Sequence, residues 1–274
     1  MSAKTIIVTR PSGQARQLIE MLTQVIENSD VAKRSLPEII SLPLLTIVPK
    51  ADDALADHIA TVLKDADLAI FVSPNAIESV MRLLERGWQE FSKQIIPIGV
   101  MGGSSQIALE HHGIGSELKP TPIIISKNNA QWDSEGLWHE LQTLGWDWAS
   151  KKVVIFKGDG GRDWLADTLK NAGANVEAIS TYTRIPLDID NPAWEAIHDV
   201  DFSKSLWLLT SSEAVRYLGT VMKDQFTQDL STASALCPHH NIADAAEIIG
   251  FGEVFTTESG DEALIKASLA WLTL

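Results

Sequence analysis

The sequence predicts an α/β fold with two parallel-sheet lobes, and two observations support this prediction. Short apolar runs alternate with longer amphipathic segments along most of the 274 residues. Repeated strand, turn and helix units build a parallel sheet with helices on both faces. Two extended segments, Ser41–Pro49 and Asn175–Pro186, interrupt this alternation. A chain of this length can bury two cores, so these segments are candidates for links between two lobes.

The first strand is expected at Thr5–Thr9, and a helix is expected at Ser12–Glu27. Apolar residues in that helix recur at three- and four-residue spacing, which is typical of an amphipathic helix. The same pattern predicts later strand and helix pairs: Leu68–Ser73 with a helix starting at Pro74, Ile95–Gly99 with Ser104–His112, Val153–Lys157 with Arg162–Asn171, and Leu206–Thr210 with Ser212–Met222.

The two interrupting segments are rich in β-branched residues, are bounded by proline and leave no room for a helix beside them. We expect linker strands at residues 39–49 and 175–186. Lobe one then combines residues 1–38 with 187–274, and lobe two is residues 50–174. A simple in-line division is the alternative, and composition alone does not choose between them.

Charge and composition restrict the class of partner. Acidic residues outnumber basic ones, 36 against 22, which gives a formal net charge of −14. A surface this acidic argues against nucleic acid and anionic membranes, which need clustered cations. A small anionic ligand remains compatible, because a few cations and backbone N–H groups can form a local site. We therefore expect a small-molecule partner.

The sequence shows no sign of export, membrane insertion or metal binding. The amino-terminal residues lack a leader-like apolar region, and no run approaches the roughly 18 apolar residues of a membrane span. The one cysteine, Cys237, cannot form an internal disulfide. The histidine pairs His111-His112 and His239-His240 are adjacent, and neighbours on a helix point about 100° apart, so they cannot chelate one ion. We expect a cytoplasmic protein without a metal, and a monomer by default.

The segment from Lys157 to Arg162 is the most specific local feature. A strand enters a glycine-rich turn containing Gly158 and Gly161, and a helix is expected to open at Arg162. Backbone N–H groups in such a turn converge on an anion, and the two cations add charge. The alternative is a tight turn that needs glycine for its geometry alone. Neither dinucleotide nor P-loop fingerprints occur, which argues against a nucleotide enzyme.

Hydroxyl residues end two other predicted strands in a similar way. Phe71–Ile77 and Leu209–Val215 each contain an apolar strand end, hydroxyl residues and a helix start. Serine at such a position caps the helix, and the same helix end can bind an anion. Ligands of open α/β sheets bind at the carboxyl ends of the strands. The candidates here are Ser73, Thr210, Ser211 and Ser212.

Three further residues are candidates for the site. Arg10 follows the first strand, although it is equally compatible with a solvated or ion-paired surface residue. Ser105 lies in a small-residue turn at a helix start, which is equally typical of a tight turn. Tyr182 is one of only two tyrosines and lies in the second linker strand. Its phenol group is expected to reach a cleft, with packing as the alternative.

Several motifs then occur in order along the chain: Thr9-Arg10-Pro11, Val72–Ala76, Gly102–Ser105, Ser134–Leu137, Lys157–Arg162, Tyr182-Thr183-Arg184, Thr210–Val215 and Pro238–Phe251. Their order and spacing resemble those of the uroporphyrinogen-III synthase family over nearly the whole chain. The glycine turn and the Tyr-Thr-Arg segment are the most telling. The chain departs from the family pattern at Val72, where threonine is frequent, and at His239-His240-Asn241, where some members have a threonine pair.

The resemblance implies two α/β lobes joined by a two-stranded linker and a cytoplasmic enzyme of haem biosynthesis. The family takes hydroxymethylbilane, a linear tetrapyrrole with eight carboxylates. It closes the ring with inversion of the last pyrrole and loss of water, and it needs no cofactor. The expected substrate-binding residues are Arg10, Ser73, Ser105, Lys157, Gly158, Gly161, Arg162, Thr210, Ser211 and Ser212.

Tyr182 is the expected catalytic residue. Departure of hydroxide from the hydroxymethyl group leaves an azafulvenium cation, and a hydrogen-bond donor near the leaving oxygen assists this step. Strict strand alternation places Tyr182 on one face with Ser180 and Arg184. The rival hypothesis is a two-lobed, non-enzymatic binding or sensor protein for a polycarboxylate, which the turns and lobes fit equally well.

Overall fold

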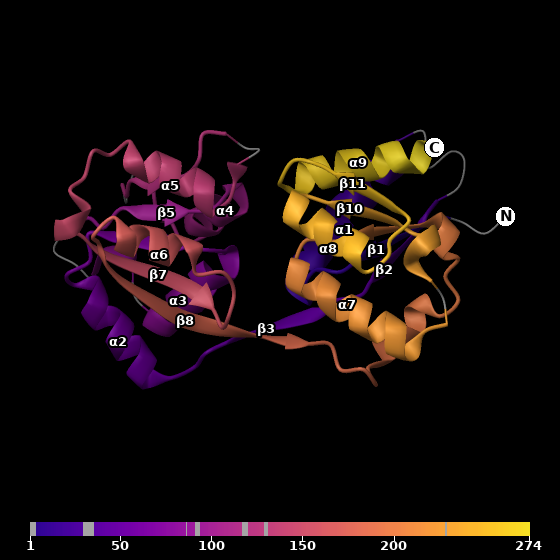
Figure 1. Cartoon of the computed structure of the whole chain (residues 1–274), viewed down its shortest axis with the longest axis horizontal. Helices are drawn as coiled ribbons and strands as arrows, with labels where there is room; N and C mark the ends of the chain where they lie inside the picture. The colour runs from indigo at the N-terminus through magenta and orange to yellow at the C-terminus, as the bar shows by residue number, and fades with distance from the viewer. Residues whose placement is uncertain are drawn as a thin grey trace. The chain divides into compact units, whose positions relative to one another are not determined.

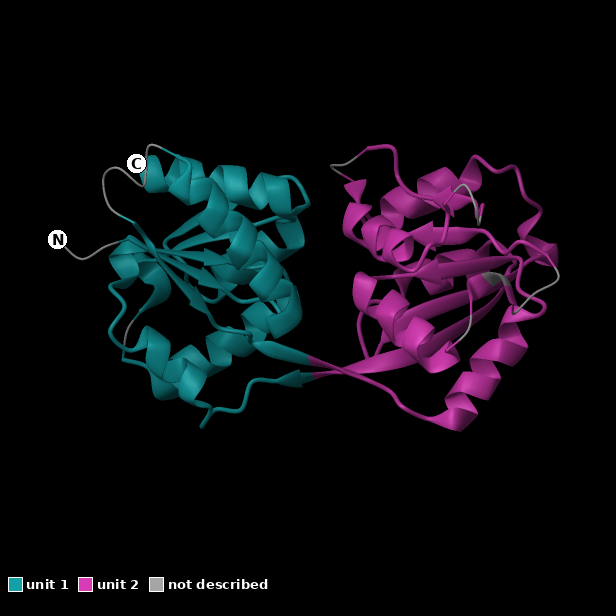
Figure 2. Ribbon diagram, turned by 180° about the vertical axis from the view of Figure 1, so that it is seen from behind, with its two compact units in different colours: residues 1–46, 185–274 teal, residues 47–184 magenta. Residues whose placement is uncertain are grey.

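The structure is a computed structural model that describes residues 4–29, 36–85, 87–90, 94–116, 120–128, 131–227 and 229–274. It divides into two compact units, which Figure 2 colours separately. Unit 1 contains residues 1–46 and 185–274, and unit 2 contains residues 47–184. The chain therefore passes between the units within the two segments expected to be linkers.

Unit 1 is built on a five-stranded sheet in the order β11-β10-β9-β1-β2. Every neighbouring pair in this sheet is parallel. The central strands are fully buried apolar runs, as expected for a sheet covered on both faces. The strands are β1 (Thr5–Val8), β2 (Glu38–Ser41), β9 (Ser205–Leu208), β10 (Ser234–Cys237) and β11 (Glu253–Thr256).

Helices cover both faces of this sheet (Figure 1). On one face, α1 and α9 pack against Ile6, Val8 and Leu206. On the other face, α7 and α8 pack against Ile7 and Trp207. The helices are α1 (Ser12–Glu27), α7 (Ser212–Gln225), α8 (His240–Ile248) and α9 (Asp261–Thr273).

Unit 2 is built on a six-stranded sheet in the order β3-β8-β7-β4-β5-β6. The pairs from β8 to β6 are parallel. Phe71 and Phe156 stack on adjacent strands with ring centroids 4.9 Å apart. The strands are β3 (Leu45–Pro49), β4 (Leu68–Phe71), β5 (Ile98–Val100), β6 (Ile123–Ile124), β7 (Lys152–Gly158) and β8 (Asn175–Pro186).

Both faces of the second sheet are also covered. Helices α2, α3 and α4 pack with Phe71 and Phe156 on one face. Helices α5 and α6 pack with Ile70 and Ile155 on the other. The helices are α2 (Asp53–Leu63), α3 (Pro74–Leu84), α4 (Gly103–His111), α5 (Ser134–Gln142) and α6 (Trp164–Asn171), and short 3-10 helices lie at Trp88–Glu90, Trp148–Ser150, Pro192–Ile197, Phe202–Lys204 and Leu230–Thr232.

The strand order reverses once in each sheet. In unit 1, β1 leads through α1 to β2 on one side, while β9 leads through α7 to β10 on the other. In unit 2, β4 leads to β5 and β7 leads to β8 in opposite directions. The helices that follow adjacent strands then leave on opposite faces, which opens a crevice at the carboxyl ends of the strands. The β1/β9 and β4/β7 edges are therefore the places to look for a ligand.

The predicted α/β class with parallel sheets is confirmed, and several element limits change. Ser41–Pro49 is not one strand, because Ser41 ends β2 and a new strand begins at Leu45. Arg162 lies in the turn and does not open the helix, which begins at Trp164. Residues 30–35, near the expected end of the first part of lobe one, lie outside the described part of the chain. None of the described helices is long and apolar enough to cross a membrane.

Candidate functional site

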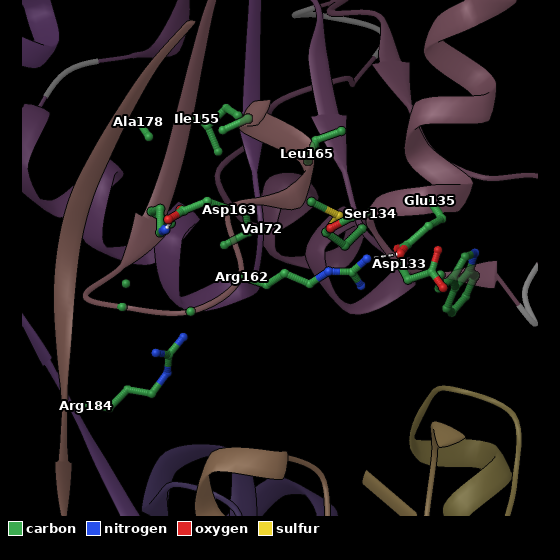
Figure 3. A pocket seen from close by; sticks show the side chains of 17 residues that line it. Val72, Asp133, Ser134, Glu135, Ile155, Arg162, Asp163, Leu165, Ala178 and Arg184 are labelled. Carbon is green, nitrogen blue, oxygen red and sulfur yellow. Dashed lines mark hydrogen bonds and ion pairs between the residues drawn. The ribbon is translucent and has the colours of Figure 1, made fainter. Parts of the chain in front are cut away.

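A cavity of about 310 Å³ lies in unit 2 at the carboxyl ends of β4, β5 and β7. It coincides with the edge at which the strand order reverses. Four of the predicted binding residues line it: Lys157, Gly158, Gly161 and Arg162. Figure 3 shows the side chains around it. The other lining residues are Val72, Met101, Trp132, Asp133, Ser134, Glu135, Ile155, Gly160, Asp163, Leu165, Ala166, Ala178 and Arg184.

Two cations of the cavity are held by carboxylates from neighbouring turns and helices. Lys157 pairs with Asp163, and Arg162 pairs with Glu135 at the start of α5. The Arg162 side chain is 54% exposed and lies over the ring of Trp164, 5.2 Å from its centroid. An exposed ion pair contributes little to stability, so an incoming anion can replace the carboxylate at small cost.

Gly103 lets the indole ring of Trp132, which lines the cavity, pack closely against the start of α4. A Cβ on Gly103 would lie 2.6 Å from the ring of Trp132, which also donates a hydrogen bond to the Ser126 carbonyl at 3.2 Å. Asp133 caps α5 by accepting from the Gly136 N–H at 2.8 Å. These contacts fix an indole ring and a helix start beside Arg162.

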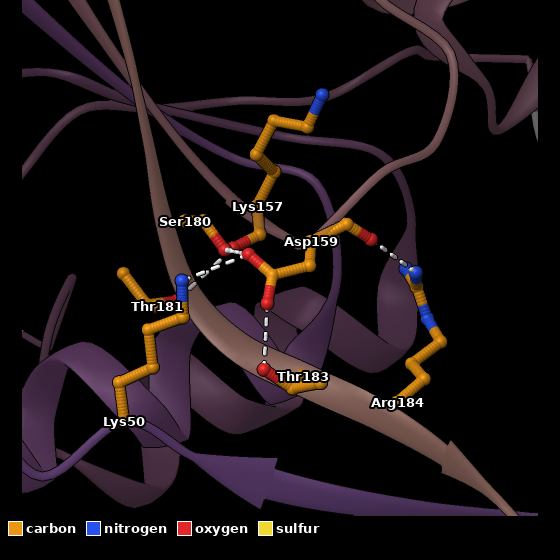
Figure 4. A network of polar contacts seen from close by, with 7 residues as sticks. All are labelled: Lys50, Lys157, Asp159, Ser180, Thr181, Thr183 and Arg184. Carbon is orange, nitrogen blue, oxygen red and sulfur yellow. Dashed lines mark hydrogen bonds and ion pairs between the residues drawn. The ribbon is translucent and has the colours of Figure 1, made fainter.

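Asp159 organises the glycine turn (Figure 4). Its carboxylate accepts from Lys50 at 2.8 Å, from Thr183 at 2.6 Å and from the Ser180 hydroxyl group. Its carbonyl accepts from Arg184 at 3.1 Å. The Lys50 ammonium group, followed by the two hydroxyl groups, holds the pKa of this carboxyl well below its usual range. Asp159 thus ties the turn after β7 to β8.

Tyr182 does not share a face with Ser180, because β8 contains a bulge. The pairing with β7 runs from Lys157 opposite Ser180 to Gly158 opposite Tyr182, so one residue of β8 is extra. A bulge of this kind reverses the side-chain alternation beyond it. Ser180 and Thr183 therefore both reach Asp159, while Tyr182 turns into the core and is 1% exposed.

The phenol group of Tyr182 lies between Ser73 and Arg184. The Tyr182 oxygen is 3.0 Å from Ser73 Oγ, and Arg184 Nη2 donates to it at 3.2 Å. Ser73 also caps α3, accepting from the Ala76 N–H at 3.3 Å. The Tyr182 ring packs on Gly158, where a Cβ would lie 2.6 Å from Cε2. Gly158 is thus required for the position of the tyrosine.

In unit 1, the predicted residues gather at the β1/β9 edge. Arg10 donates to Asp261 at 2.6 Å, which ties the end of β1 to the start of α9. Thr210 follows β9, and Ser211 caps α7 by accepting from Ala214 N–H at 3.4 Å. Ser212 donates to the Asn241 carbonyl at 3.0 Å, which joins the starts of α7 and α8. The ion-paired alternative considered for Arg10 is the one observed.

Other candidates lie elsewhere. Ser105 lies in the first turn of α4, is 2% exposed and does not line the cavity. Cys237 is buried, and burial raises the pKa of its thiol to about 12, which makes it a poor nucleophile. Among the described residues, no group of three or more His, Cys, Asp or Glu side chains is placed to hold a metal ion.

Three parts of this site were not predicted from the sequence. Asp159 lies inside the quoted glycine motif, but its partners come from β8 and from Lys50, far away in sequence. Glu135 lies 27 positions from Arg162. Trp132 is one of nine tryptophans in the chain and lies in none of the quoted motifs. The available clues were Asp159 between two glycines of the turn and Glu135 within the Ser134–Leu137 motif.

Comparison with known proteins assigns the family. A sequence profile described as uroporphyrinogen-III synthase HemD matches residues 10–266. The chain belongs to the uroporphyrinogen-III synthase family. The synthase of Escherichia coli K12 is 25% identical over 270 residues, which cover 96% of this chain and 99% of that protein. The synthase of Salmonella typhimurium is 26% identical over 272 residues, with 96% and 99% covered.

Solved synthase structures share the fold. A mutant uroporphyrinogen III synthase from the extreme thermophile Thermus thermophilus aligns with a TM-score of 0.58 at 14% identity, covering 99% of both chains. The synthetase from Helicobacter pylori 26695 aligns with the same TM-score at 12% identity, covering 98% of this chain and 99% of that one. These solved structures therefore have the fold that the resemblance to the family implied for this chain.

We predict that Gly158→Ala moves the ring of Tyr182. The added methyl group would lie 2.6–2.7 Å from two ring carbons, so the variant should be destabilised by about 1–3 kcal/mol. Thermal unfolding measures the loss, and NMR of labelled tyrosine reports the ring, since the chain has only two tyrosines. Gly13→Ala, with no atom within 4 Å of the new Cβ, is the control. An unchanged Tyr182 signal would contradict this packing.

We predict that Asp159→Asn destabilises the protein in a pH-dependent way. A carboxyl group whose pKa is lowered by folding stabilises the native state above its unfolded pKa, and this contribution is lost as the pH falls through the folded pKa. The variant should be about 1 kcal/mol less stable at pH 7, because Asp159 is largely solvated. The difference should shrink below the ordinary pKa of 3.8.

Urea unfolding between pH 7 and pH 3 measures this difference. Asp65→Asn removes an exposed carboxylate that lies 3.4 Å from Lys152, and it serves as the control. A gap between Asp159→Asn and the parent protein that stays constant down to pH 3 would show that the carboxylate charge has no part in holding the turn.

Proposed function

We propose that this family member converts hydroxymethylbilane into uroporphyrinogen III. Family membership over residues 10–266 is the observation that carries the proposal. The cation-flanked turn at the β4/β7 edge supports it, because a substrate with eight carboxylates needs anion-binding groups more than redox groups. The family assignment favours the synthase over a non-enzymatic polycarboxylate-binding protein.

In this proposal, the carboxyl edge of the sheet in each unit offers groups that can bind a substrate carboxylate. The turn after β7 offers the backbone of Gly158 and Gly161 together with Lys157 and Arg162. The β1/β9 edge offers Arg10 and hydroxyl groups of Thr210, Ser211 and Ser212. Ser105, which is 2% exposed and does not line the cavity, is not part of this set. Several weak interactions of this kind suit a flexible substrate, because together they fix its conformation although no single interaction is strong.

The proposed reaction requires mainly that the protein position the two reacting ends of the substrate. Departure of hydroxide from the terminal hydroxymethyl group, which leaves as water once it takes a proton from a donor, gives an azafulvenium cation that the pyrrole nitrogen stabilises. Attack by the substituted carbon of the last ring gives a spirocyclic intermediate, which fragments and recloses with that ring inverted. Holding two ends of one chain together is worth several kcal/mol of barrier, roughly 7–11 in good intramolecular cases. The Ser73–Tyr182 pair assists this step as an acid, by a hydrogen bond to the departing hydroxyl oxygen of the substrate.

The product isomer tests the function. The purified protein is incubated with hydroxymethylbilane, and the products are oxidised and separated as porphyrin isomers. We expect isomer III in excess, formed by a cytoplasmic monomer that needs no metal, nucleotide or flavin. The same assay is run after exhaustive EDTA treatment, and we expect the rate to be unchanged. Isomer I alone, the product of spontaneous closure, would contradict the function, and activity restored by one added metal would contradict the cofactor requirement.

We predict that substitutions of the two members of the Arg162–Glu135 pair have different effects on KM. Arg162→Ala should raise KM roughly 10-fold or more, because it removes a charge-assisted hydrogen bond to a substrate carboxylate. Glu135→Gln should leave KM unchanged or lower it, because it frees the guanidinium group. Both variants lose the same exposed ion pair, so their melting temperatures should fall equally little. Equal rises in KM for the two variants would make the pair structural.

A further inference from the structure

We propose that Ser73 is the residue that donates a hydrogen bond to the departing hydroxyl group, and that Tyr182 acts through Ser73 as a positioning residue. This inference rests on the proposed function and deepens it. It moves the catalytic contact from the phenol group, where the sequence pattern predicted it, to the serine. Two observations carry it: the burial of Tyr182 and the hydrogen-bonding capacity of the three side chains in contact.

Tyr182 is enclosed on every side that the structure describes. Its side chain belongs to the core cluster that contains Phe71 and Phe156, and 1% of the residue is exposed. Gly158 contacts the ring where a Cβ would otherwise lie, and Arg184 covers it with its guanidinium carbon 5.3 Å from the ring centroid. The phenol group is therefore closed to a substrate atom in this arrangement.

The direction of the hydrogen bonds follows from what each group can donate. A guanidinium group has donors only, so Arg184 donates and the Tyr182 oxygen accepts. The buried phenol O–H then needs an acceptor, because an unsatisfied buried donor is costly. Ser73 Oγ, 3.0 Å away, is the acceptor that the described contacts provide. The order is therefore Arg184 to Tyr182 to Ser73.

The hydroxyl hydrogen of Ser73 also needs an acceptor. Ser73 Oγ accepts from both Tyr182 and the Ala76 N–H, which occupies the two lone pairs of a hydroxyl oxygen. Its own O–H therefore points to a different acceptor. Ser73 follows β4 and is partly exposed, and the preceding residue, Val72, lines the cavity. The leaving hydroxyl oxygen of the substrate is an acceptor of the kind this O–H requires.

The proposed step balances its protons and electrons. The C–O bond of the hydroxymethyl group breaks, and both electrons leave with the oxygen. That oxygen takes the Ser73 proton and departs as water, while Ser73 takes the Tyr182 proton. The resulting phenolate is paired with the Arg184 guanidinium group. Ring closure releases one proton from the unsubstituted carbon of the last pyrrole, and this proton restores the phenol.

A double-mutant cycle tests this order. Ser73→Gly removes the hydroxyl group but keeps a residue that caps helices well, and Tyr182→Phe removes only the phenol oxygen. Each should lower kcat for isomer III by roughly 10- to 1000-fold with little change in KM. Because the two groups act in series, the double variant should lose no more than Ser73→Gly alone. Ser73→Thr, which retains a hydroxyl group, should keep most of the rate.

Two controls separate chemistry from folding. Asp52→Ala removes the cap of α2, where the carboxylate accepts from Ala54 N–H at 2.9 Å, and should leave kcat unchanged. Tyr217→Phe removes the other tyrosine hydroxyl group, which donates to the Leu187 carbonyl, and should also leave kcat unchanged. Melting curves of all variants identify losses caused by unfolding.

The outcomes distinguish this inference from the function itself. A parent protein that yields isomer I alone contradicts the proposed function. A parent that yields isomer III while Ser73→Gly keeps the full rate contradicts the role of Ser73. Losses that multiply in the double variant also overturn the inference, because they mean that Tyr182 reaches the substrate on its own.

Discussion

The reversal of strand order is the constraint on which the rest of this structure depends. In each parallel sheet, two adjacent strands send their following helices to opposite faces, β1 and β9 in unit 1 and β4 and β7 in unit 2. Their carboxyl ends are then left uncovered, and helix starts, whose first N–H groups have no partner within the helix, lie beside them. Glycine and hydroxyl residues at those ends are the anion-binding groups that we propose. A net charge of −14 over the whole chain is compatible with this, because the sites are local.

In our proposal, the β4/β7 edge serves both substrate binding and catalysis. The turn that carries the cations is the turn whose Gly158 admits the ring of Tyr182. Asp159 in the same turn holds Arg184 through its carbonyl, and Arg184 donates to the phenol oxygen. A substrate carboxylate bound at this turn, as we propose, would lie beside the groups that orient the Tyr182–Ser73 pair. We infer that substrate binding and acid assistance share one scaffold, with no separate catalytic dyad.

The sequence predicted the fold class and many element limits but not the side-chain contacts. Ser12–Glu27 and Asn175–Pro186 have the predicted limits, because amphipathic and β-branched patterns are local signals. The prediction that Tyr182 shares a face with Ser180 was wrong, because a bulge depends on the partner strand and leaves no mark in its own strand. Arg184, predicted on the same face, does contact the phenol oxygen. The Arg162–Glu135 pair joins residues far apart in sequence, so spacing alone could not reveal it.

The most direct test of this account is to determine which edge of each sheet binds the tetrapyrrole. Deuterated, ¹⁵N-labelled protein is titrated with uroporphyrinogen III under anaerobic conditions, and backbone amide shifts are followed by NMR. The account predicts the largest shifts at the carboxyl edges, in residues 9–12, 72–76, 157–162 and 209–214. Shifts confined to the opposite edges, in residues 36–38, 66–68, 151–153 and 203–205, would contradict it.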